Sequence, residues 1–207
     1  MNQRQKGFGL VELMISITLG LLLMTSVVKL LQDSMKSNGD LAASKRLENN
    51  LHATLDLVAR DLRRSGAMGD PIRQLWGVNN PFGRDPVSAV DGEAAASCLT
   101  FSYDFDGDGG LDANAPEERY GFRLASGVVQ MRVAGNGCDT QDDASWQDVT
   151  TSGVVNVSQL QFVVNTNTAR GVTQQSVQIQ IAGHLVRDPE ITRTLSRRVR
   201  LRNDLLL

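Results

Sequence analysis

The first thirty residues carry a dense run of apolar side chains that the rest of the chain lacks. From Phe8 to Val28 there are 21 residues with a single charged side chain, Glu12. At about 1.5 Å of rise per helical residue, such a run spans roughly 31 Å, the thickness of the hydrocarbon core of a bilayer. Its apolar positions cover the whole circumference of a helix, whereas a core helix of a soluble protein, the alternative, would keep a polar face. The pattern therefore predicts a membrane-spanning helix over residues 8–30.

A second helical pattern follows over residues 31–65. Apolar positions recur at steps of four, four, three and four, which is the spacing of one stripe on an amphipathic helix: Leu47, Leu51, Leu55, Val58 and Leu62. No proline precedes Pro71, so we expect both segments to form one rod that ends near residues 65–66, with residues 37–40 as its weakest point. The stripe is expected to pack on a β-sheet of the same chain; the alternative is an intermolecular coiled coil.

Beyond Gly66 the apolar period changes to two. Strands are predicted over residues 99–103, 120–125, 128–133, 155–164, 176–186 and 195–201. The alternation of Val177, Ile179 and Ile181 with glutamines is typical of a sheet with one buried and one solvated face. Residues 66–207 are therefore interpreted as a β-rich head, and residues 67–97 within it as a long irregular connection. The expected fold class is α+β, a long N-terminal helix against an antiparallel sheet.

Composition and charge exclude several classes of protein. The 207 residues include 19 Gly, 5 Pro and 2 Cys, which does not fit a collagen-like, low-complexity or disulfide-dense chain. A net charge of -2 argues against a dedicated nucleic-acid binder. The two histidines, His52 and His184, fall in separate predicted elements, and the sequence has no phosphate-binding loop, paired-histidine zinc motif or nucleophile elbow. We therefore expect no enzymatic activity.

A short basic leader, residues 1–7, precedes the apolar run and ends in Gly7. The order Gly7, Phe8 and then Glu12 inside the run resembles the prepilin signal of type IV pilins and their secretion-system relatives. The resemblance implies that a membrane peptidase cuts between Gly7 and Phe8 and methylates the new amino terminus on Phe8. The alternative is an ordinary secretory signal, with cleavage near residue 26, which would discard the helix.

Glu12 is informative because a carboxylate at mid-membrane costs roughly 2.5 to 3.5 kcal/mol. Cleavage after Gly7 would create a cationic α-amino group on Phe8, with a reference pKa of roughly 8. In pilins the resemblance implies that Glu12 of one subunit neutralises the amino terminus of its neighbour as the helices bundle. The alternative is a glutamate that lies among the lipid headgroups.

Two later segments, residues 55–66 and 199–203, extend the resemblance to PilW-type minor pilins of the type IV pilus. This implies an inner-membrane, single-pass protein with a periplasmic head, which reaches the pilus and cell surface after assembly. The implied partners are the prepilin peptidase and other minor and major pilins, and the implied role is priming of pilus assembly in support of twitching motility. A minor pseudopilin of a type II secretion system is the nearest alternative. A membrane-tethered calcium-binding module that does not polymerise is another.

Cys98 and Cys138 are the only cysteines. Both would lie outside the cytoplasm, where an isolated pair of cysteines ordinarily forms a disulfide. Closing a loop of this length would contribute about 4 kcal/mol by the chain-entropy relation. Free thiols are the alternative.

An acidic loop lies between the two cysteines. Four carboxylates at relative positions one, three, five and nine, and a carbonyl at position seven, offer the oxygens that Ca²⁺ prefers: Asp104, Asp106, Asp108, Asp112 and Gly110. Position twelve, where an EF-hand has a bidentate glutamate, is Ala115, and Glu117 or Glu118 would substitute only in a longer loop. No Lys or Arg occurs from Asp85 through Glu118, a charge imbalance that favours a cation. A solvated acidic turn is the alternative.

Arginines accumulate near the end of the chain, at positions 187, 193, 197, 198, 200 and 202. Alternation places Arg198, Arg200 and Arg202 on the strand face opposite Val199 and Leu201. We interpret this face as a solvated one that protects a sheet edge from pairing. A contact surface for the acidic loop of a neighbouring subunit is the alternative.

Overall fold

The computed structural model describes residues 9–69, 80–85, 87–90, 92–112, 116–133, 137–138, 143–169, 172–201 and 205–206. The chain divides into two units, Met1–Ala43 and Ser44–Leu207. Each unit is described by itself below. The predicted leader, residues 1–7, lies outside the described residues, as does Phe8.

The first unit consists of the first half of helix α1 (Leu10–Leu62). Every large apolar side chain from Leu10 to Leu41 is at least 48 % exposed. Residues 37–40, the predicted weak point, are helical like their neighbours. The hydroxyls of Ser16, Thr18, Thr25 and Ser26 donate hydrogen bonds to carbonyls of the same helix. Over residues 10–28, where Glu12 is the single charge, an uncovered apolar surface with internally satisfied hydroxyls is what a lipid or helix-bundle environment requires.

The second half of α1 belongs to the second unit and buries one face. The predicted stripe of Leu47, Leu51, Leu55, Val58 and Leu62 is buried, with each side chain at most 3 % exposed. The helix ends at Leu62, and in the turn that follows Gly66 adopts a φ of 73°, a left-handed conformation that suits glycine. The predicted helix end at residues 65–66 is correct to about one helical turn.

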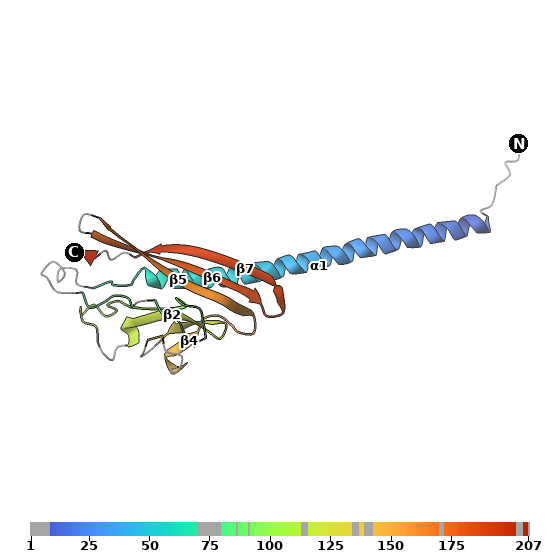
Figure 1. Ribbon diagram of the computed structural model, residues 1–207. Coiled ribbons are helices and arrows are strands. Elements are labelled where there is room, and N and C mark those ends of the chain that lie inside the picture. Colours follow the sequence, from blue (N-terminus) through green and yellow to red (C-terminus); the bar gives the residue numbers. More distant parts are fainter. Residues whose placement is uncertain are drawn as a thin grey trace. The chain divides into compact units, whose positions relative to one another are not determined.

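The strands of the second unit form two antiparallel sheets (Figure 1). The first sheet has the order β1-β2-β3-β4, with β1 (Cys98–Ser102), β2 (Arg119–Ala125), β3 (Val128–Arg132) and β4 (Trp146–Asp148). The second has the order β5-β6-β7, with β5 (Val155–Ala169), β6 (Val172–Leu185) and β7 (Asp188–Arg200), while β8 (Leu205–Leu206) pairs with β6. Two short 3₁₀ helices, η1 (Pro116–Glu118) and η2 (Asp143–Ser145), precede β2 and β4.

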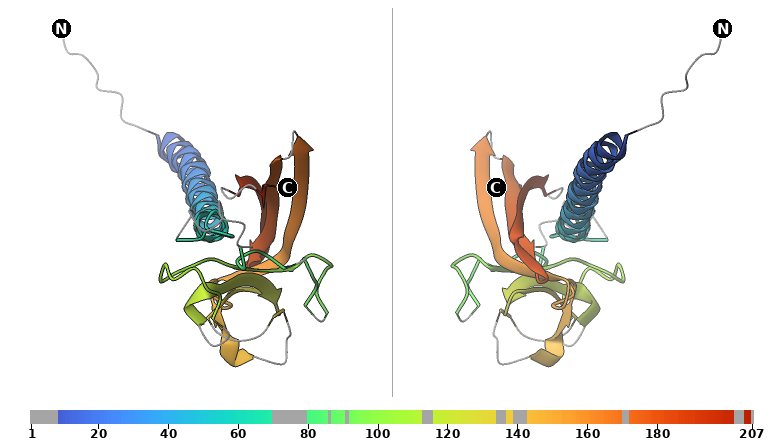
Figure 2. Two further views of the ribbon diagram at one scale, coloured as in Figure 1. Left: turned by 90° about the vertical axis from the view of Figure 1, so that its left-hand side faces the viewer. Right: turned by 90° about the vertical axis from the view of Figure 1, so that its right-hand side faces the viewer.

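The second sheet packs on the second half of α1, which confirms the expected α+β fold with the helix on an antiparallel sheet. Its middle strand buries Val177, Ile179 and Ile181, each 0 % exposed. Arg197 of β7 pairs with Asp56 of α1, and Arg193 donates a hydrogen bond to Ser44. Figure 2 shows this part of the helix beside the second sheet, with the first sheet as a further layer.

The presence of two sheets was not predicted. They meet along β5, where the N–H of Val157 donates to Gly127 O at 2.8 Å and the N–H of Phe162 donates to Ala96 O at 3.0 Å. These contacts cover the part of the β5 edge around residues 157–162 that would otherwise be exposed. The described part of residues 67–97 contains only isolated bridges, such as Ser88 with Cys98, in agreement with the predicted irregular connection.

The arginines of β7 divide between its two faces. Arg193 and Arg197 lie on the face that carries Val199 and contact α1, a role that the sequence interpretation did not assign. Arg198 and Arg200 are exposed, as expected from the alternation. Arg202 lies outside the described residues.

Candidate functional site

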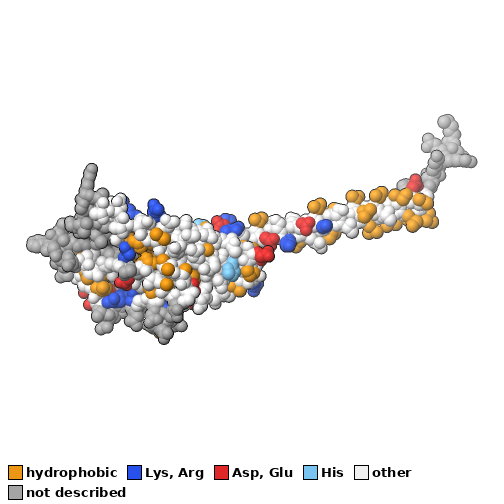
Figure 3. All heavy atoms as spheres, in the orientation of Figure 1, with side chains coloured by type: hydrophobic (Ala, Val, Ile, Leu, Met, Phe, Trp, Pro, Cys, Tyr) orange, Lys and Arg blue, Asp and Glu red, His pale blue; other side chains and the backbone are white. Residues whose placement is uncertain are grey.

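Glu12 is the only charged residue in the described segment 9–28 of α1. Its Oε2 accepts a hydrogen bond from the N–H of Gly9 at 3.1 Å, in the first turn of the helix. All large apolar side chains around it are exposed (Figure 3). Gly7 and Phe8, the predicted processing residues, lie outside the described residues. Within the described part of the chain, α1 is the one helix long and apolar enough to cross a membrane, which makes it a candidate anchor.

The acidic loop follows β1 directly and is organised around Asp104. The Asp104 carboxylate accepts hydrogen bonds from the N–H groups of Gly69 at 2.8 Å, Gly107 at 2.6 Å and Gly109 at 3.0 Å. Partial burial acts to raise the pKa of Asp104, but these three donors outweigh it and lower the pKa. Asp104 is therefore held ionised by a loop that wraps around it.

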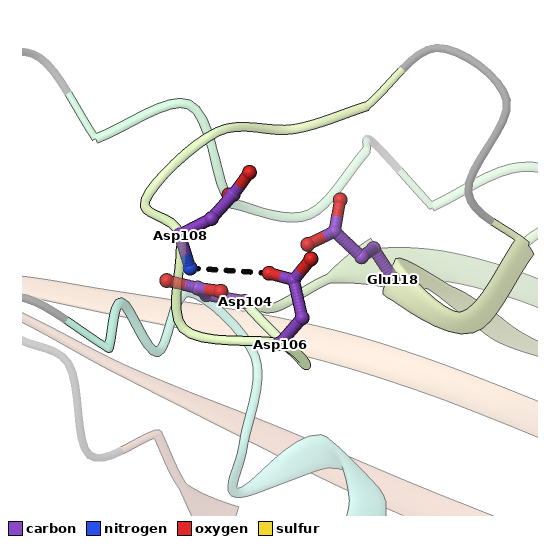
Figure 4. Close-up of side chains that lie close together, drawn as sticks. All are labelled: Asp104, Asp106, Asp108 and Glu118. Carbon is purple, nitrogen blue, oxygen red and sulfur yellow. Dashed lines mark hydrogen bonds between the residues drawn. The ribbon is translucent and has the colours of Figure 1, made fainter.

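Asp106 and Asp108 extend the same arrangement. Asp106 Oδ1 accepts the N–H of Asp108 at 3.1 Å, and Asp108 Oδ1 accepts the N–H of Gly110 at 2.7 Å. These local bonds turn the backbone so that successive carboxylates gather on one side of the loop (Figure 4).

Glu118 is the fourth acidic residue of this group. One carboxylate oxygen each from Asp104, Asp106, Asp108 and Glu118 lies within 4.8 Å of the others. Oxygens bound to one ion at about 2.4 Å are at most about 4.8 Å apart, so the four satisfy a necessary condition for sharing a Ca²⁺ ion. The group could hold a metal ion.

Glu118 differs from the three aspartates in its burial. Its side chain is 2 % exposed, and its Oε2 accepts the N–H of Asp112 at 3.0 Å. Its Oε1 has no hydrogen-bond partner among the described residues. Burial raises the pKa of Glu118, and the nearby carboxylates of Asp106 and Asp104 add to the effect, against the lowering by the backbone N–H groups of Asp112 and Phe105.

The arrangement differs from the predicted ligand set. Asp104, Asp106 and Asp108 come together as predicted, but the Asp112 carboxylate is not one of the four, and Asp112 contributes its N–H to Glu118 instead. Gly110 contributes its N–H to Asp108. Ala115, at position twelve, lies outside the described residues, and Glu118 three positions later joins the group.

Strand register explains the position of Glu118. Ser102 of β1 pairs with Arg119 of β2, and one step further the N–H of Tyr103 donates to Glu118 O at 3.3 Å. Antiparallel pairing thus sets Glu118 opposite Tyr103, which precedes Asp104 in the chain. The sequence left Glu117 and Glu118 as substitute ligands in a longer loop, and the register of β1 with β2 distinguishes between them.

Cys98 and Cys138 form a disulfide, with a Cα–Cα distance of 6.0 Å. It joins the start of β1 to the connection between β3 and β4, beside the buried side chains of Val90 and Trp146. Arg123 lies over the Trp146 ring at 4.6 Å. Because the acidic loop lies between Cys98 and Cys138 in the chain, the disulfide closes a covalent loop that contains it.

Comparison with known families gives two matches. The family described as prepilin peptidase-dependent protein B matches residues 40–201, and the prokaryotic N-terminal methylation motif matches residues 2–28. Searches of curated proteins and of solved structures give no match. The two matches do not specify the PilW branch, but the first covers most of the chain and the second includes Gly7, Phe8 and Glu12. The chain therefore belongs to the prepilin peptidase-dependent protein B family of type IV pilin-like proteins.

Proposed function

We propose that the protein is a minor pilin of the type IV pilus. It is cleaved between Gly7 and Phe8, methylated on Phe8, held in the inner membrane by residues 8–30, and incorporated with other minor and major pilins into a complex that primes pilus assembly. The observation that carries the proposal is the apolar, uncovered segment 9–28 of α1, in which Glu12 is the single charged residue.

Glu12 supplies the specific part of the assembly contact. An isolated carboxylate in lipid costs roughly 2.5 to 3.5 kcal/mol, a cost that a cationic partner offsets. The N-methylated amino group of Phe8 on a neighbouring subunit is that partner. Burial of apolar helix surface among other helices supplies the rest of the stabilisation, and the head selects the neighbours.

The head is periplasmic in this proposal. The Cys98–Cys138 disulfide supports the assignment, because such bonds persist in oxidising compartments and are rare in the cytosol.

The group of Asp104, Asp106, Asp108 and Glu118 binds Ca²⁺ in this proposal. Four carboxylates on a turn-rich loop suit Ca²⁺, which accepts six to eight oxygens in flexible geometry, better than Mg²⁺, which demands a near-ideal octahedron. The ion would neutralise carboxylates that otherwise repel one another and would stabilise the loop.

Deletion of the gene tests the assembly role. We expect loss of surface pili and of twitching motility, both restored by the full-length gene supplied in trans. Intact pili with lost exoprotein secretion would instead assign the protein to a type II secretion system as a minor pseudopilin.

A further inference from the structure

Glu118 is the one member of the acidic group that is both buried and incompletely bonded. Its Oε1 lacks a hydrogen-bond partner among the described residues although the side chain is only 2 % exposed. A buried carboxylate oxygen without a partner is destabilising unless a ligand compensates it. Figure 4 shows the Glu118 carboxylate directed at Asp106, so that a cation between the four side chains would contact it.

The acidic loop also holds the segment that follows α1. Gly66 N–H donates to Ser102 O at 2.9 Å, Asp104 N–H donates to Ala67 O at 2.9 Å, and Gly69 N–H donates to Asp104 Oδ2 at 2.8 Å. Residues 66–69 therefore run along the end of β1 and the start of the loop, bonded at three points.

Gly69 makes the closest approach in this contact. A Cβ added there would lie 2.7 Å from the Cα of Gly107 and 3.1 Å from Asp104 Oδ2. The contact thus excludes a side chain at position 69 and joins this segment to two parts of the loop.

The end of α1 is fixed at the same place. The guanidinium of Arg64, in the turn after the helix, lies 4.0 Å from the centre of the Tyr103 ring, and Tyr103 stacks on Tyr120 at 4.2 Å. Tyr103 directly precedes Asp104. The acidic group therefore adjoins the contacts that anchor the end of α1 to the first sheet.

We infer that Glu118 is the closing ligand of the Ca²⁺ site and that Ca²⁺ binding fastens residues 66–69, and with them the C-terminal end of α1, to the loop between β1 and β2. The inference rests on the Ca²⁺ binding proposed above. It assigns the ion a structural role at the point where the helix joins the head, separate from the Glu12 contact.

The ligand role is tested by titrating Ca²⁺ into the full-length protein in detergent micelles after treatment with a chelator, with calorimetric readout. Glu118→Gln keeps the shape of the side chain and an acceptor for the Asp112 N–H but removes the charge. We expect its Ca²⁺ affinity to fall at least tenfold. The matched control is Glu117→Gln, an exposed neighbour outside the group, which should keep the affinity of the unmodified protein.

Asp106→Asn provides a second variant at an exposed position, where replacement should not disturb folding. It too should lose affinity at least tenfold. Equal Ca²⁺ affinities in the unmodified protein and in a folded Glu118→Gln variant would overturn the assignment of Glu118.

The fastening role is tested by hydrogen exchange of the same full-length protein, with and without Ca²⁺. If opening of residues 66–69 breaks the site, a Ca²⁺ concentration 100 times the Kd should slow exchange of the Gly66, Gly69 and Asp104 N–H groups by up to about 100-fold. Core amides at residues 177–181 of β6 should not respond to the same degree. Glu118→Gln should abolish the effect.

Gly69→Ala tests the coupling from the other side. Its Cβ displaces the segment from Gly107 and Asp104, so Ca²⁺ affinity should fall, because coupling between two events is reciprocal. Gly153→Ala, at a glycine with open space around it, should leave the affinity unchanged.

The outcomes separate the inference from the proposals beneath it. Ca²⁺ binding without added protection of residues 66–69 would overturn the fastening role and leave the ion site standing. Absence of Ca²⁺ binding at millimolar concentration would overturn both. Neither result touches the assembly role, which depends on Glu12.

Discussion

Two halves of the same helix differ in what covers them. Over residues 10–43 of α1, apolar side chains occur on every side and all the large ones are exposed. Over residues 44–62, apolar side chains form one stripe, and that stripe is buried in the head. Continuous backbone bonding makes both halves helical, so the difference lies entirely in the side chains. The distribution of apolar positions around a helix thus predicts whether its partner is its own fold or an external apolar phase.

The largest effect is expected from Glu12, the one charged residue in segment 9–28 of the first half. Glu12→Ala removes the carboxylate that the neighbouring amino terminus is proposed to neutralise, so the protein should reach the membrane but fail to join pili. The measurement is immunodetection of the protein in membrane and sheared-pilus fractions. Glu48→Ala is the control in the second half: Glu48 pairs with Lys45 at 3.0 Å on the surface, where such pairs contribute little. Normal pilus incorporation of the Glu12→Ala protein would contradict the assembly role.

The next largest effect is on the free energy of unfolding of the head, to which the two halves of α1 should contribute differently. Leu51→Ala leaves a cavity in the core of the head and should lower its free energy of unfolding by about 2–5 kcal/mol. Leu22→Ala, at a side chain 65 % exposed, should leave the stability of the head unchanged. Urea denaturation of the full-length proteins in detergent, followed by tryptophan fluorescence, measures both. Equal effects of the two substitutions would mean that the halves do not differ as described.

A third effect is confined to the head. Replacing Cys98 and Cys138 together by Ser should lower the free energy of unfolding by up to about 4 kcal/mol, because the open loop gains conformational entropy in the unfolded chain. The same denaturation assay measures the change. An unmodified protein tested with and without reductant serves as the comparison, and reductant should have no effect on the double variant. A double variant as stable as the disulfide-bonded protein would show that the bridge does not constrain the head.

Much of the fold followed from local pattern. The stripe of α1 and the alternating positions of β6 report burial directly, and both were predicted correctly. β4 was missed because only Trp146 of its three residues is buried, which leaves no alternation to detect. Residues 165–169 of β5 and 172–175 of β6 were missed because most of them, such as the exposed pair Asn167 and Gln174, are polar and show no apolar alternation.

In the candidate sites too, some contacts followed from spacing along the chain and others did not. Asp104, Asp106 and Asp108 are close in sequence, so their spacing was sufficient to bring them together. Glu118 reaches them through the register of β1 with β2, and Arg197 reaches Asp56 through packing of a strand on the helix. Contacts of this kind depend on tertiary arrangement, which spacing along the chain does not encode.

The most direct test of the pilin assignment is mass spectrometry of the full-length gene product isolated from membranes. The account predicts a chain that begins with N-methylated Phe8 and, in cells without the prepilin peptidase, a chain that keeps residues 1–7. A protein that retains those seven residues in peptidase-positive cells and still supports pilus assembly would contradict it.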